Sequence, residues 1–82
     1  MTITYSTKAK DDLVKIDWKI RHRIIEELNH LERDESLGKL KKISDTTFYK
    51  INFLDHLVIG TVNSDKISII TVVEKKKLSI PR

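Results

Sequence analysis

The spacing of the hydrophobic residues changes once along this chain, near residue 47, and this change limits the possible folds. Before it, apolar residues recur every three or four positions, as on one face of a helix: Ala9, Leu13, Ile16, Ile20, Ile24, Leu28 and Leu31. After it, Tyr49, Ile51 and Phe53 alternate with Phe48, Lys50 and Asn52, as they do in a strand. Helices followed by strands predict an α+β fold, with helices packed on a small sheet.

The helical part follows a short β-branched segment. Thr2-Ile3-Thr4-Tyr5 predicts a first strand, and Ser6 or Thr7 offers an N-cap hydroxyl for a helix that begins near Lys8. Asp17 is a good N-cap for a second helix, so the two helices meet almost without a loop. We therefore expect a helical hairpin with one shared apolar face.

Short polar turns separate the strands of the second half. Leu57 to Val62 follows after Asp55-His56, and Lys66 to Glu74 follows after Asn63-Ser64-Asp65. Turns this short force antiparallel neighbours, so we expect a three-stranded meander. Residues 34–45 are interpreted as a loop. The expected order is β-α-α-β-β-β, a helical hairpin on a mainly antiparallel sheet, with the first strand antiparallel to a meander strand at the far side.

The meander carries more apolar residues than a one-sided sheet needs. Simple alternation divides them into two faces, with Phe48, Leu54, Val58, Ile70 and Val72 on one and Ile51, Phe53, Ile59 and Ile69 on the other. We expect the helices to cover one face, and the loop, the C-terminal tail or a partner to cover part of the other.

Length and composition exclude several classes of protein. The 82 residues suit one domain, residues 1–82, and the absence of cysteine excludes disulfides and thiolate zinc sites. No apolar stretch has the length of a membrane span, and the N-terminus lacks the pattern of a signal peptide. We expect a cytoplasmic protein without membrane contact, metal or cofactor.

The positive net charge of +4 comes from two short segments. The first holds Lys39, Lys41, Lys42 and Lys50 against Asp45, and the second holds Lys75, Lys76, Lys77 and Arg82 against Glu74. If the fold brings the two segments together on the exposed side of the sheet, they form one surface for a polyanion. The alternative is that these are ordinary solvated lysines that keep a small protein soluble.

Several local patterns together resemble the RelE/ParE superfamily of type II toxins. They are the strand-to-helix junction Tyr5-Ser6-Thr7-Lys8-Ala9, the basic loop Leu37-Gly38-Lys39-Leu40-Lys41-Lys42, the paired strands Tyr49-Lys50-Ile51 and Leu57-Val58-Ile59, and the strand end Val72-Val73-Glu74-Lys75-Lys76-Lys77. The resemblance implies a toxin neutralised by a cognate antitoxin. RelE-like members are endonucleases that cut mRNA on the ribosome, while ParE-like members poison DNA gyrase.

For an endonuclease, the resemblance implies metal-free attack of the 2′-hydroxyl on the scissile phosphate, which needs cations and groups that transfer protons. The catalytic candidates are Lys50, Glu74, Lys75 and Lys77, with Glu74 as a base. The candidates for phosphate binding are Lys39, Lys41, Lys42, Lys50, Lys75, Lys76, Lys77 and Arg82. For Lys50 the alternative is a solvated strand lysine, and for the lysines after Glu74 it is a polar tail.

The chain departs from the RelE pattern at two positions. Leu57 occupies the place where RelE-type enzymes carry an arginine, and Ser79 lies where a tyrosine often transfers a proton. Glu74 and His56 are the candidates to replace these two missing groups, although His56 is better interpreted as a turn residue. Trp18 is interpreted as a packing anchor at the helix junction, with an exposed role in antitoxin binding as the alternative. Three functions therefore remain open: an mRNA endonuclease, a gyrase inhibitor, or a decayed module that binds nucleic acid or antitoxin.

Overall fold

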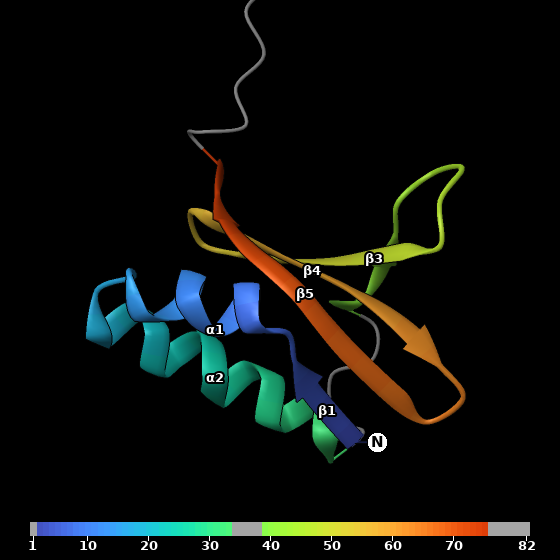
Figure 1. Cartoon of the computed structure of the whole chain (residues 1–82), viewed down its shortest axis with the longest axis horizontal. Coiled ribbons are helices and arrows are strands. Elements are labelled where there is room, and N and C mark those ends of the chain that lie inside the picture. Colours follow the sequence, from blue (N-terminus) through green and yellow to red (C-terminus); the bar gives the residue numbers. More distant parts are fainter. Residues whose placement is uncertain (1, 34–38, 76–82) are drawn as a thin grey trace, which may run out of the picture.

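The computed structural model describes residues 2–33 and 39–75, which form two helices and a five-stranded sheet (Figure 1). The elements follow in the order β1 (Thr2–Tyr5), α1 (Thr7–Val14), α2 (Trp18–Glu32), β2 (Lys41–Lys42), β3 (Phe48–Phe53), β4 (His56–Asn63) and β5 (Lys66–Glu74). The expected α+β class is confirmed. Within the described ranges, neither helix is long and apolar enough to cross a membrane.

Both helices begin at the residues that the sequence indicates. The Ser6 hydroxyl accepts a hydrogen bond from the Ala9 amide at 2.9 Å, and the Asp17 carboxylate accepts one from the Lys19 amide at 3.2 Å. These side chains cap α1 and α2, because they satisfy amides that have no partner within the helix. The two helices lie on the same side of the sheet (Figure 1). The expected helical hairpin is confirmed.

Trp18 is not the packing anchor that the sequence predicts. Its side chain is 62% exposed at the start of α2, and the Lys19 ammonium lies 5.8 Å from the centre of its ring. Ile16 and Ile20 pack against the core instead. These two isoleucines fill the space between the helix junction and the core, and the Trp18 indole lies on the surface.

The strands are ordered β1-β5-β4-β3-β2. The antiparallel meander of β3, β4 and β5 is confirmed. However, β1 runs parallel to β5, with Ile3 opposite Ile67, so the expected antiparallel placement of the first strand is wrong. Only a short hairpin forces two strands to be antiparallel. Here both helices and three strands separate β1 from β5, which allows the parallel arrangement.

Strand β2 is absent from the predicted order. Lys41 and Lys42 pair antiparallel with Lys50 and Tyr49 at the edge of the sheet. Two adjacent lysines have neither the β-branched composition nor the alternation that marks a strand. Their pairing uses backbone groups, and a short lysine-rich edge also disfavours pairing with another chain.

The division of apolar residues between the two faces also differs from simple alternation. The two-residue turn Leu54-Asp55 places Ile51 opposite Val58, so both point to the helices. In β5 one extra residue, Ile70, lies between the partners of Gly60 and Ile59, and this β-bulge reverses the alternation beyond it. The core side of the sheet therefore carries Ile51, Val58, Ile67, Ile69 and Val72, which pack with Ala9, Leu13, Ile24, Leu28 and Leu31.

Candidate nucleic-acid interface

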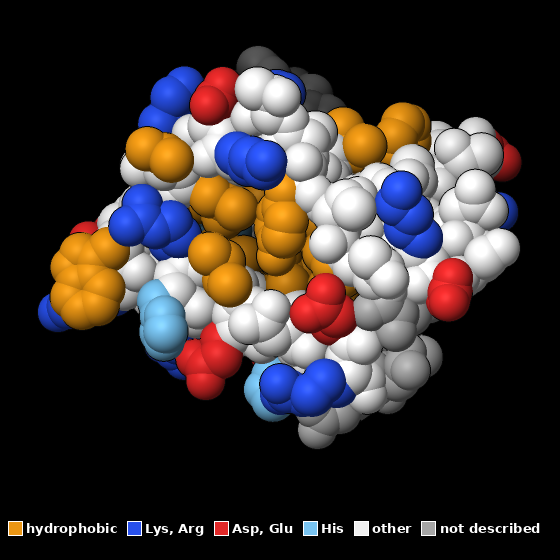
Figure 2. Space-filling view, turned by 60° about the horizontal axis from the view of Figure 1, so that its bottom comes forward, with side chains coloured by type: hydrophobic (Ala, Val, Ile, Leu, Met, Phe, Trp, Pro, Cys, Tyr) orange, Lys and Arg blue, Asp and Glu red, His pale blue; other side chains and the backbone are white. Residues whose placement is uncertain are grey.

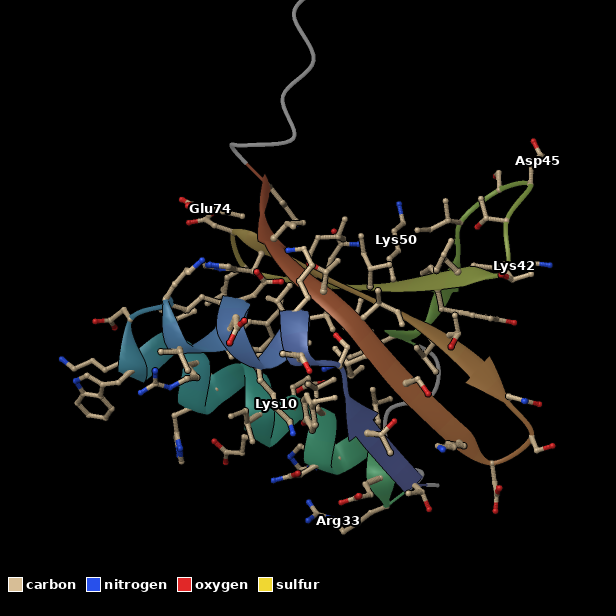
Figure 3. All side chains as sticks on the ribbon, viewed as in Figure 1. Lys10, Arg33, Lys42, Asp45, Lys50 and Glu74 are labelled. Carbon is tan, nitrogen blue, oxygen red and sulfur yellow. The ribbon has the colours of Figure 1, made fainter. Side chains whose placement is uncertain are left out.

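Two lysines lie directly opposite each other on the side of the sheet that faces away from the helices, here called the outer face. Lys50 precedes the buried Ile51 in β3, so its side chain takes the outer face, and Figure 3 shows it pointing away from both helices. Lys41 is its partner in β2. Directly opposed residues of this kind have Cβ atoms about 5 Å apart. The sheet therefore holds the bases of two lysine side chains side by side on this face.

This lysine pair is not neutralised within the described part of the chain. The ion pairs there join Lys8 to Asp12, His22 to Glu26 and Lys39 to Glu27, and neither the Lys41 nor the Lys50 ammonium has a hydrogen-bond partner among the described residues. Like charges placed directly opposite on a sheet disfavour folding. An anion that bridges both amines would remove this repulsion, which makes the pair a suitable phosphate site.

The other predicted cations do not all join this pair. Lys42 lies opposite Tyr49 and takes the other side of the sheet, because successive strand residues alternate. Lys39 forms an ion pair with Glu27 of α2, so its charge already has a partner within the chain. Lys75 follows β5 and is exposed, about 16 Å from Lys50 by strand spacing and rise. Lys76, Lys77 and Arg82 lie outside the described residues.

Next to the lysine pair, the outer face is apolar. Ile59 lies opposite Lys50 in β4, and Leu57 lies between Asn52 of β3 and Val73 of β5. Leu57 and Ile59 are both half-buried. Leu57 thus occupies the row where the resemblance to RelE-type enzymes would place an arginine, and it gives this row no phosphate ligand.

The structure does not bring Glu74 together with Lys50. Because the bulge at Ile70 reverses the alternation of β5, Glu74 lies on the same side as Val72, and it faces a groove beside the helices. Figure 3 shows Glu74 and Lys50 well apart, at different places around the sheet. Glu74 is therefore not placed to act as a base for a reaction at Lys50. Without the bulge it would lie on the outer face, as the sequence suggests.

The groove that contains Glu74 has a volume of about 650 Å³ and was not foreseen from the sequence. Its residues come from three separate segments: Lys8, Asp12, Lys15, Ile16, Asp17 and Ile20 from the helices, Asp55 and His56 from the β3–β4 turn, and Val72, Val73 and Glu74 from β5. Within the described chain, the buried Nδ1 atom of His56 has no hydrogen-bond partner. No local sequence pattern signals a groove assembled in this way.

The described residues offer no metal site, since no three of their His, Asp or Glu side chains lie close enough to hold an ion.

The helix side of the molecule has exposed apolar side chains, with Val14 72% exposed near the end of α1. Figure 2, which brings the underside of the molecule forward, shows hydrophobic side chains gathered near its middle among Lys and Arg side chains. Such a mixed surface is typical of a site for a protein partner.

Comparisons with known proteins agree with this architecture. The family model described as "ParE toxin of type II toxin-antitoxin system, parDE" matches residues 3–78. A chain of the RelB-RelE antitoxin-toxin complex from Methanococcus jannaschii is similar, at 26% identity and a TM-score of 0.78, with 92% of this chain and 93% of that chain covered. A chain of the YoeB-YefM complex from Staphylococcus aureus has 28% identity, a TM-score of 0.66, and coverage of 87% and 92%.

The intact RelBE complex from Escherichia coli has the same fold in one of its chains. The TM-score is 0.74 at 14% identity, with 89% of this chain and 94% of that chain covered. No curated protein matches the chain significantly in sequence. The solved structures thus agree with the family model on the architecture of the chain.

Proposed function

Since this chain belongs to the ParE toxin family of type II toxin–antitoxin systems, we propose that it arrests growth by cutting mRNA on the ribosome, with Lys41 and Lys50 binding the phosphate backbone. The observation that carries this proposal is that Lys41 and Lys50 lie opposite each other on the outer face with no acidic partner among the described residues. Their mutual repulsion disfavours folding, yet two opposed ammonium groups suit a bridging phosphate oxygen. Similarity to chains of complexes that contain RelE and YoeB, at 26% and 28% identity, supports the endonuclease, because RelE-like toxins cut mRNA.

The chemistry available on the outer face is mainly electrostatic. When the 2′-hydroxyl attacks the phosphate, negative charge grows on the phosphoryl oxygens, and two ammonium groups stabilise it. The described strand residues of this face include no imidazole and no carboxylate, since His56 and Glu74 line the groove. Solvent water then accepts the proton that the attacking 2′-hydroxyl releases, and a lysine ammonium donates a proton to the leaving 5′ oxygen as the P–O5′ bond breaks. We expect slow cleavage compared with an enzyme that has a tuned acid–base pair.

A cognate antitoxin is the expected protein partner, because the similar structures include toxin–antitoxin complexes. We propose that an acidic segment of the antitoxin covers the lysine pair and so competes directly with RNA. Binding of this kind weakens as salt screens the charges. The exposed apolar side chains of the helices would supply the remaining contact area.

Gyrase inhibition is the second candidate, and Leu57 favours it. An apolar row beside two lysines suits a protein surface better than a bare phosphate chain, and the matching family model is that of ParE toxins. In this case the outer face would bind a protein, and Lys50 would contribute to affinity without taking part in chemistry.

The deciding experiment incubates purified protein with ribosomes programmed with mRNA and maps cleavage by primer extension. We expect cleavage by the unmodified chain, and a loss of about tenfold or more in Lys50→Ala and Lys41→Ala. Lys10→Ala is the matched control, because Lys10 is an exposed lysine of α1 on the helix side, and we expect it to leave cleavage unchanged (Figure 3).

Absence of cleavage together with trapped gyrase–DNA complexes would establish the second candidate. Absence of both, without growth arrest, would indicate a binding module.

A further inference from the structure

The groove beside the helices differs in charge from the rest of this basic protein. Of its four carboxylates, Asp12 is engaged by Lys8 at 3.1 Å and by the Thr71 hydroxyl at 2.6 Å. Asp17, Asp55 and Glu74 remain, with Lys15 as the one further cation among the lining residues. No ion pair within the described chain engages Asp55 or Glu74. The groove thus has an excess of negative charge.

Its remaining surface is apolar. Ile16 and Ile20 line it from the helices, and Val72 lines it from β5. A segment that fits must therefore combine positive charge with aliphatic side chains, so that both kinds of surface are satisfied.

We propose that this groove is the docking site of the chain's own C-terminal segment, residues 76–82. This segment carries Lys76, Lys77 and Arg82 as cations and Leu78 and Ile80 as aliphatic residues, with no acidic residue. Its charge and its apolar content both complement the groove. Seven residues reach about 23 Å when extended, which is enough to enter a groove that Glu74 lines.

The position of the segment in the chain favours it over any free ligand. It follows Lys75, whose amide is held by the Asp55 carbonyl at 2.8 Å at the edge of the groove. A tethered segment has an effective concentration in the millimolar range, so weak contacts are enough for substantial occupancy. A basic segment of another protein would have to compete with it.

Docking has a consequence that rests on the proposed function. Glu74 and the groove lie on the helix side, whereas the lysine pair lies on the outer face. A docked segment therefore directs Lys76 and Lys77 away from Lys50, and release makes them available to phosphate. The segment would then exchange between the acidic groove and the RNA, and RNA would compete with docking.

The test measures docking directly and does not depend on activity. The chain has no cysteine, so Ser79→Cys gives a single site for a nitroxide spin label in the full-length protein. Paramagnetic broadening of amide signals then reports where the label lies. We expect broadening at Ile16 and Ile20 to exceed that at Lys50 and Ile59 by about threefold or more, and to fall at high salt.

Matched variants identify the carboxylates responsible. Asp55→Asn combined with Glu74→Gln should reduce the broadening at Ile16 and Ile20 about threefold, because both charges are removed at nearly constant volume. Asp65→Asn, in the exposed β4–β5 turn, is the control and should leave it unchanged. Equal or stronger broadening at Lys50, no broadening at the helices, or insensitivity to both groove substitutions would each overturn the proposal. These outcomes are independent of whether RNA is cut.

Discussion

At the scale of single residues, Asp12 links the first helix to the last strand. Pairing between β1 and β5 ends at Tyr5 and Ile69, so the next stretch of β5 has no neighbouring strand on that side. There the Asp12 carboxylate accepts hydrogen bonds from the Thr71 hydroxyl at 2.6 Å and the Val72 amide at 3.1 Å. Burial tends to raise the pKa of Asp12, but these hydrogen bonds and Lys8 outweigh it and hold the pKa below its usual value.

We expect Asp12→Ala to lower the free energy of unfolding by about 2 kcal/mol at pH 7, because a charged acceptor is lost. Asp11→Ala, next to it on the exposed side of α1, is the control and should change little. A lowered folded-state pKa means that Asp12 stabilises fully above the unfolded-state pKa of about 3.9, and that this contribution is lost progressively as pH falls from that value through the lower folded-state pKa. Denaturant unfolding of the two variants between pH 7 and pH 2.5 tests this. A difference that did not decrease toward the acidic end would contradict the assignment.

Leu54 is a second residue with a measurable effect. It has a φ of 51° in the two-residue turn between β3 and β4, and its side chain is 56% exposed. Left-handed backbone is unfavourable for leucine and tolerated by asparagine. Leu54→Asn should therefore raise the free energy of unfolding by about 0.5–1 kcal/mol. Val14→Asn, an exposed apolar residue at the end of α1, should not. A loss of stability in Leu54→Asn would show that the leucine side chain contributes more than its backbone conformation costs.

At the scale of elements, the sequence predicts the helices and strands that are determined by local patterns of residues. Both helices and the meander follow from periodicity, capping residues and short turns. The parallel pairing of β1 and the backbone-paired β2 have no local signal, because both depend on how distant segments assemble. The bulge at Ile70 has the greatest effect on the candidate site, since it places Glu74 at the groove and not on the outer face. One inserted residue in a strand therefore changes which side chains can share a site.

Gly60 marks the same irregularity from the side of β4. A Cβ atom at this position would lie 2.5 Å from the Ser68 carbonyl oxygen, which belongs to the backbone of β5. The strands would have to separate to admit a methyl group, so Gly60→Ala should lower the free energy of unfolding by about 2–3 kcal/mol. Thr61→Ala, at the next residue of β4, should have a smaller effect. Chemical denaturation measures both. Equal effects of the two substitutions would mean that the strands separate easily at the bulge.

At the scale of the whole molecule, the sheet separates two charged surfaces. The outer face carries the lysine pair Lys41 and Lys50, and the helix side carries the groove with Asp17, Asp55 and Glu74. The net charge of +4 conceals this division. A polyanion is attracted to one side of the sheet and a basic segment to the other. Under our two proposals, the same small fold binds its target and a segment of opposite charge at sites that do not overlap.

If the lysine pair serves binding, its removal should improve folding while it weakens function. Lys50→Met keeps the aliphatic length but removes one of two opposed charges, so the free energy of unfolding should rise by about 0.5 kcal/mol. Affinity for a single-stranded RNA oligonucleotide should fall, and the slope of log affinity against log salt should become shallower by about 0.7, as for one lost phosphate contact. Lys10→Met changes the net charge equally but should alter neither quantity. If both variants weakened binding to the same extent, overall charge would explain the affinity. If Lys50→Met lost stability, the two amines would not repel each other strongly enough to support the argument for a phosphate site.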